Sequence, residues 1–197
     1  MGATNQAAVA PARAALPFTN RLILANVRVA VLAFAVAAAM AFMQSISRAN
    51  LELPFRSARM YYMSITAHGV LMALVFTTFF IMALGYAVVQ RDNGDIRWPK
   101  LAVASYVTAL AGTLMTTVTI LSFKASVLYT FYPPMQAHPA FYIGLTLVVV
   151  GSWGWTAIVI AGWRAARAAN TGRPVSLAMH AMAVTAMLWA LATVGVA

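Results

Sequence analysis

Long apolar stretches separated by short polar connections organise this chain. The apolar stretches are continuous and do not alternate between apolar and polar residues with a period of two, which favours helices over strands. Each stretch reaches the roughly 20 residues that an α-helix needs to cross about 30 Å of hydrocarbon. The pattern therefore predicts an all-α, polytopic membrane helical bundle with five transmembrane helices. We expect them at about residues 22–43, 60–89, 101–123, 140–163 and 175–197.

The segment before the first apolar stretch differs from the rest. Residues 1–18 are rich in alanine and contain Pro11 and Pro17, which predicts a disordered tail. A cleaved signal peptide is not favoured, because Arg21 and Arg28 flank and enter the first apolar stretch. Residues 19–197 are then expected to form one membrane domain.

Composition supports the membrane interpretation and excludes several kinds of site. Only 8% of the residues are charged, whereas a soluble domain carries roughly 25%. The formal net charge is +10, but the basic residues are scattered between the apolar stretches, so nucleic-acid binding is not expected. The absence of cysteine excludes disulfides, thiolate zinc sites, iron–sulfur clusters and covalent c-type heme attachment.

The basic residues also predict an orientation. With five spans, nine lysines and arginines fall on the side of the N-terminus and four on the other. Basic residues are enriched in cytoplasmic connections, so we expect a cytoplasmic N-terminus and an external C-terminus. The first group is Arg13, Arg21, Arg28, Arg91, Arg97, Lys100, Arg164, Arg167 and Arg173, and the second is Arg48, Arg56, Arg59 and Lys124.

One histidine stands inside an apolar stretch. An imidazole in hydrocarbon is costly without a partner, so His68 is a functional hypothesis by default. Gly69 beside it removes a side chain where a large flat ligand would approach the backbone. The pair suggests an axial ligand to a heme iron. On the residue alone, a hydrogen bond from His68 to a neighbouring helix is an equal alternative. His138 and His180 have no other ligand at metal-site spacing, so we interpret them as structural or solvent-facing.

Two further features concern packing and surface. Small residues within the spans suit close contact between helices, among them Gly69, Gly112, Gly144, Gly151 and Gly154. The connection at residues 124–142 contains Pro133-Pro134 and a cluster of aromatic residues. The paired prolines stiffen the backbone, so this connection is expected to form a rigid lid at the membrane surface rather than only an aromatic belt.

Two sequence blocks together resemble subunit I of the heme–copper oxygen reductases, most closely the B-type cytochrome c oxidases. The first block is Tyr61-Tyr62, Thr66-Ala67-His68-Gly69-Val70-Leu71 and Ala73-Leu74-Val75-Phe76-Thr77. The second is Val127-Leu128-Tyr129-Thr130-Phe131-Tyr132-Pro133-Pro134 with Ala140-Phe141-Tyr142. They lie on the second span and on the connection between the third and fourth spans, where that family has them.

The resemblance implies roles for four residues. His68 would be one axial ligand of the low-spin heme b, with a neutral ring whose other nitrogen bonds a nearby acceptor, and Gly69 would flank it. In the family, the loop matching Tyr129 to Pro134 packs close to the high-spin heme and the oxygen route. Tyr129 and Tyr132 are therefore candidates to line that pocket, with simple loop packing as the alternative. No residue of the chain is assigned to catalysis.

The chain also departs from the family pattern. The family's subunit has at least twelve spans, and the second low-spin heme ligand, the high-spin heme ligand and the copper-binding histidines are missing here. We therefore expect the N-terminal portion of an oxidase subunit I, truncated or one half of a split subunit, that is inactive alone. Its expected role is to bind the low-spin heme and contribute to electron transfer for oxygen reduction, while missing segments supply the high-spin heme and copper.

The resemblance also implies a setting. Expected partners are the remaining part of subunit I, oxidase subunit II, and cytochrome c or a similar electron donor, in a bacterial or archaeal plasma membrane. All three acidic residues, Glu52, Asp92 and Asp95, lie in connections, which fits the B-type branch. We interpret Asp92 and Asp95 as part of a solvated turn rather than a proton entrance.

Two other functions remain open from the sequence. A nitric oxide reductase of the same superfamily would carry non-heme iron in place of copper. A non-catalytic five-span b-type cytochrome would need a second intramembrane histidine at matching depth. His180 is the only candidate, and the predicted topology puts it at the opposite membrane face from His68.

Overall fold

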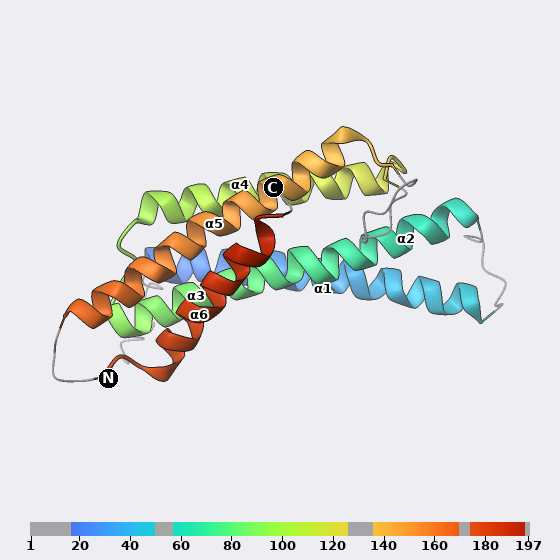
Figure 1. Cartoon of the computed structure of the whole chain (residues 1–197). Helices are drawn as coiled ribbons and strands as arrows, with labels where there is room; N and C mark the ends of the chain where they lie inside the picture. The colour runs from blue at the N-terminus through green and yellow to red at the C-terminus, as the bar shows by residue number, and fades with distance from the viewer. Residues whose placement is uncertain (1–16, 50–56, 126–135, 170–173, 196–197) are drawn as a thin grey trace, which may run out of the picture.

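The computed structural model describes residues 17–49, 57–125, 136–169 and 174–195, and this part of the chain is almost entirely helical. Its elements are α1 (Phe18–Arg48), α2 (Ala58–Val70), the π-helical segment η1 (Leu71–Phe76), α3 (Thr77–Asn93), α4 (Pro99–Leu121), α5 (Pro139–Ala168) and α6 (Leu177–Thr193). An isolated antiparallel bridge joins Ala125 to Ala137. Figure 1 shows α1 running along the continuous helix formed by α2, η1 and α3, with α4 beside α5.

The predicted all-α membrane bundle is confirmed. Within the described residues, four helices are long and apolar enough to cross a membrane: Phe18–Arg48, Ala58–Asn93, Pro99–Leu121 and Pro139–Ala168. The fifth apolar stretch forms α6, which has 17 residues and is shorter than the others. At 1.5 Å per residue α6 is roughly 26 Å long, and it packs across α3 and α5 (Figure 1).

Polar residues and prolines set where the helices begin and end. The hydroxyls of Ser57 and Ser176 accept hydrogen bonds from backbone N–H groups in the first turns of α2 and α6. Pro99 and Pro139 stand in the first turns of α4 and α5, where a missing N–H costs nothing. Gly94 follows α3 with a φ of 84°, a conformation that glycine adopts without strain.

Glycines bring α4 and α5 into direct backbone contact, as their sequence positions predicted. A Cβ atom at Gly151 would lie 2.7 Å from the backbone nitrogen of Ala109 and the backbone oxygen of Ser105. Cβ atoms at Gly112, Gly144 and Gly154 would also clash with the facing helix. Close backbone approach is a principal source of helix association in lipid, where the hydrophobic effect between helices is weak.

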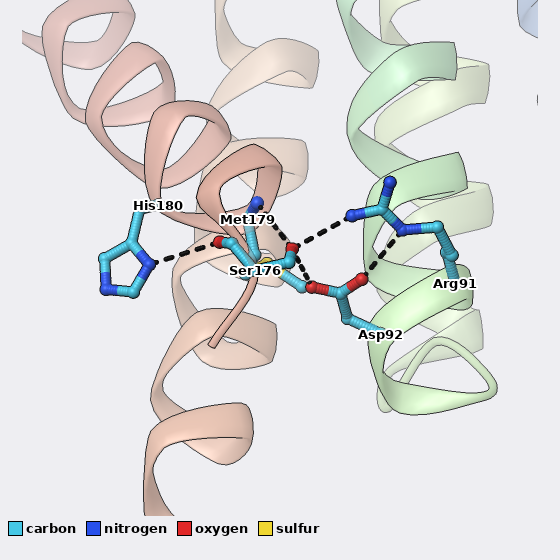
Figure 2. A network of polar contacts seen from close by, with 5 residues as sticks. All are labelled: Arg91, Asp92, Ser176, Met179 and His180. Carbon is cyan, nitrogen blue, oxygen red and sulfur yellow. Dashed lines mark hydrogen bonds and ion pairs between the residues drawn. The ribbon is translucent and has the colours of Figure 1, made fainter. Parts of the chain in front are cut away.

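One end of the bundle carries a polar network that joins α3 to α6 (Figure 2). Asp92 accepts a hydrogen bond at 2.9 Å from Arg91 Nε and another from the Ser176 hydroxyl. The Ser176 oxygen accepts hydrogen bonds from Arg91 Nη2 at 2.9 Å and from the Met179 N–H at 3.2 Å. We refer to this end, where α3 ends and α6 begins, as the polar end.

The other described carboxylate ties α1 to the same end. Asp95 accepts hydrogen bonds from the Thr19 hydroxyl and from the Ile96 N–H, and these bonds hold the pKa of Asp95 below its usual value. Asn93 donates to the Gly162 carbonyl of α5 at 3.0 Å. Asp92 and Asp95 are thus both engaged in contacts between elements.

Candidate functional site

His68 lies in the last turn of α2 and is half-buried. Its Nδ1 atom is 3.0 Å from the backbone carbonyl oxygen of Ala37 on α1. A carbonyl oxygen can only accept a hydrogen bond, so Nδ1 carries the proton and donates it. In the neutral ring this leaves the lone pair on Nε2, which is the arrangement that a metal-ligating imidazole requires.

Small side chains on α1 make this contact possible. Ala30, Ala33 and Ala37 are buried, at 0%, 6% and 0% exposure, and they face the helix that carries His68. With larger residues at these positions, the α1 backbone would stand too far from α2 for an imidazole to reach its carbonyl. The hydrogen bond to His68 is therefore a consequence of the close packing of two helices.

Three polar contacts follow one another along the antiparallel α1–α2 interface. Arg48 Nε donates to the Tyr61 hydroxyl at 3.0 Å, and Gln44 Nε2 donates to the Ser64 carbonyl at 3.1 Å. The His68–Ala37 contact is the third. Because the three contacts lie at successive levels on one side of α2, they fix the rotation of α2 about its axis and hence the direction of the imidazole.

The π-helical segment η1 begins directly after His68-Gly69-Val70. The Leu71 N–H reaches the carbonyls of both Ala67 and His68, where the hydrogen-bonding pattern changes. Beyond the segment, the Thr77 hydroxyl donates to the carbonyls of Ala73 at 2.5 Å and Leu74 at 3.2 Å. Isolated π turns inside α-helices are frequent at functional sites, and this one sets the register between His68 and the whole of α3.

The structure places the other candidate residues as follows. Gly69 is buried in α2 beside His68. Tyr129 and Tyr132 lie outside the described residues. His138 caps α5, its Nδ1 accepting from the Ala140 N–H at 3.2 Å.

His180 does not approach His68. It lies near the start of α6, with Nδ1 3.2 Å from the Ser176 carbonyl and its ring edge-on to Trp163 (Figure 2 shows the first contact). The residue before α6, Ser176, is hydrogen-bonded to Asp92 at the far end of α3. Asp92 is roughly 35 Å from His68 along the continuous helix, so His180 lies at the opposite end of the bundle from His68. The described residues also contain no group of three or more histidine, cysteine or acidic side chains placed to hold a metal ion. Among the described histidines, His68 is therefore the one that lies well inside a membrane-spanning helix, and it could supply one ligand to a metal ion.

The sequence predicted that the His68 ring would bond a nearby hydrogen-bond acceptor, but it did not indicate which atom this is. The acceptor is a backbone carbonyl, and no residue type marks it. The supporting residues Gln44 and Arg48 were missed because they look like an ordinary polar helix end. The alanines at positions 30, 33 and 37 were the available signal, since small residues at this spacing mark a helix interface.

Comparison with known proteins assigns the family. The family model for "Cytochrome C and Quinol oxidase polypeptide I" matches residues 21–197. Cytochrome c oxidase subunit 1 of Thermus thermophilus is 36% identical over 148 residues, which are 73% of this chain and 25% of that protein. A heme–copper terminal oxidase dimer solved by cryo-electron microscopy has a chain that superposes with a TM-score of 0.80 at 28% identity. That match covers 89% of this chain and 30% of the solved chain.

The family-model match includes the position of His68, and the part of this chain that matches the curated relative spans a quarter of that protein's length. An all-α membrane bundle with a family-model match over nearly its whole length leaves no ambiguity about descent. The chain belongs to the family of polypeptide I of the cytochrome c and quinol oxidases, and thus to the heme–copper oxidases.

Proposed function

We propose that this chain forms the part of an oxidase subunit I that binds the low-spin heme b through His68 and passes electrons toward oxygen reduction. The observation that carries the proposal is the contact between His68 Nδ1 and the Ala37 carbonyl, in a member of this oxidase family. The contact orients the imidazole, and in the neutral ring it leaves Nε2 free for iron. A bound heme would supply reversible one-electron chemistry at its iron.

The residues around His68 fit such a group. His68 supplies a nitrogen ligand whose tautomer is already set, and Gly69 beside it carries no side chain. The contacts from Arg48 and Gln44 hold α2 in place, so that little rearrangement is needed when iron binds. We assign any further protein ligand that such a heme would require to polypeptide outside these 197 residues.

The rest of the machinery is proposed to lie outside this chain. The curated relative is four times as long as the matched part of it, and we assign the high-spin heme and copper ligands to the remaining part of subunit I. Oxidase subunit II and cytochrome c or a similar donor would supply electrons. Tyr129 and Tyr132 are proposed to line the pocket beside the high-spin heme.

Oxygen consumption by the assembled protein tests this function. In lipid nanodiscs supplied with reduced cytochrome c, we expect cyanide-sensitive oxygen consumption and a low-spin b signal in the reduced-minus-oxidised spectrum. Steady reduction of nitric oxide without oxygen consumption would instead identify a nitric oxide reductase. A low-spin signal with neither activity would identify a b-type cytochrome, although the separation of His68 from His180 gives that function no ligand pair within the described residues.

We further propose that the polar end faces the cytoplasm of a bacterial or archaeal cell, with the N-terminus on that side. Among the described residues, the basic side chains near the polar end outnumber those at the opposite end. The first set is Arg21, Arg91, Arg97, Lys100, Arg164 and Arg167, and the second is Arg48, Arg59 and Lys124. Such an excess is typical of the cytoplasmic side.

Cysteine labelling checks this orientation, because the chain has no native cysteine. Gln136 and Ala169 are exposed at the two ends of α5, so Gln136→Cys and Ala169→Cys form a matched pair. We expect a membrane-impermeant maleimide to label Gln136→Cys in intact cells and Ala169→Cys only after permeabilisation. The reverse pattern would place the N-terminus outside.

A further inference from the structure

A groove of about 630 Å³ lies on the outside of the bundle at the polar end, between the start of α4 and the last half of α5. Arg97 and Trp98 line it from the segment that leads into α4. Arg164 lines it from α5, together with small side chains that include Ala157, Ala161 and Ala165. The groove therefore has two guanidinium groups at one end and an apolar floor below them.

The floor follows one face of α5. Ala157, Ala161 and Ala165 are spaced four residues apart and lie above one another on the helix surface. The opposite face of α5 is filled by buried side chains, such as Trp155 and Val159. Because the floor is mostly alanine, with Ile160 as its one larger apolar side chain, an apolar channel runs from Arg164 roughly 10 Å toward the middle of the bilayer.

The charge of the groove is not neutralised by the described part of the chain. Arg97 and Arg164 are exposed, and neither has a salt bridge among the described residues. The two described carboxylates are engaged elsewhere, Asp92 by Arg91 and Ser176 and Asp95 by Thr19 and Ile96. Trp98 is 42% exposed at the same level, as is typical of a side chain at the headgroup boundary.

We propose that this groove binds one anionic phospholipid, whose phosphate is held by Arg97 and Arg164 and one of whose acyl chains lies along the alanine face of α5. A lipid phosphate would neutralise both guanidinium groups with charge-assisted hydrogen bonds. An apolar helix packed over the same groove would bury two cations without a counter-charge, which is costly. Basic pockets between transmembrane helices on the cytoplasmic side are known to bind anionic headgroups. This inference does not depend on the role of His68.

Native mass spectrometry of the assembled protein in detergent, titrated with phosphatidylglycerol or phosphatidylcholine, tests the proposal. We expect one tightly held phosphatidylglycerol and no equivalent phosphatidylcholine. The double variant Arg97→Gln/Arg164→Gln is expected to bind that phosphatidylglycerol roughly 30-fold more weakly, because each basic residue near an anionic surface contributes about fivefold. Ala161→Phe keeps both arginines, fills the floor of the groove, and should also displace the lipid.

Arg21→Gln/Arg28→Gln is the matched control. It removes the same charge from exposed positions on α1, away from the groove, and should leave lipid retention unchanged. Equal retention of phosphatidylglycerol by wild type and the Arg97/Arg164 variant would overturn the proposal, as would equal retention of the two lipids. Displacement of the lipid by millimolar inorganic phosphate would also count against it, because the acyl chain would then contribute nothing. A cross-link from Ala161→Cys to another polypeptide, in place of lipid binding, would identify a protein occupant and reject the lipid.

Discussion

Replacing His68 with alanine is expected to abolish the low-spin b-type spectrum of the assembled oxidase. The variant loses the one described histidine that lies well inside a membrane-spanning helix, while the Gln44 and Arg48 contacts between α1 and α2 remain. Without the His68 imidazole, a bound heme would lose its low-spin character or would not be retained. The reduced-minus-oxidised spectrum should therefore lose its sharp low-spin α band, and turnover should fall to background.

Two comparisons separate ligand loss from misfolding. His180→Ala removes an exposed imidazole at the polar end and should leave the spectrum unchanged. His68→Gly with added imidazole should recover the low-spin signal, since the free base can occupy the vacated position. An unaltered low-spin spectrum in His68→Ala would show that the iron takes its ligand elsewhere.

Enlarging Gly151 is expected to be the most damaging change to the fold. The Cβ of even an alanine would lie 2.7 Å from backbone atoms of Ser105 and Ala109, and a helix backbone cannot yield as a flexible side chain can. Gly151→Leu should therefore force α4 away from α5 and destabilise the protein by about 1–3 kcal/mol or more, with Gly151→Ala intermediate. Thermal unfolding in detergent measures the effect.

Val150→Leu is the control for this prediction. Val150 precedes Gly151 on α5 and is 42% exposed, so a larger side chain there extends toward lipid. We expect its unfolding temperature to match wild type within error. If Gly151→Leu unfolds at the same temperature as Val150→Leu, the close α4–α5 contact is not a major source of stability.

The helices were predictable because the signals for them are local. Continuous apolar stretches specify spans, and Pro99, Gly94 and Ser176 mark ends through their own backbone or side-chain chemistry. The glycines of α4 and α5 predicted close packing, because a residue without a side chain lets two helix backbones approach each other. These features depend on residue type and spacing, which a sequence carries directly.

The parts that sequence did not predict depend on backbone geometry. The π-helical segment at Leu71–Phe76 has the same apolar composition as its surroundings, so no residue type in the sequence indicates the change in backbone hydrogen bonding. The partner of His68 is the carbonyl of an alanine, and only the packing of α1 against α2 brings it within 3.0 Å. His68 itself could be identified because it is a polar residue inside a long apolar stretch. The role of Tyr129 and Tyr132 stays a prediction, since they lie outside the described residues.

A cryo-electron microscopy map of the assembled protein with its cofactors would show how the His68 ring is oriented. We predict that His68 would hold the low-spin heme through Nε2 while Nδ1 keeps its hydrogen bond to the Ala37 carbonyl. A map in which the low-spin heme is held by other residues, with His68 bonded only within the α1–α2 interface, would overturn the assignment of His68 as a heme ligand.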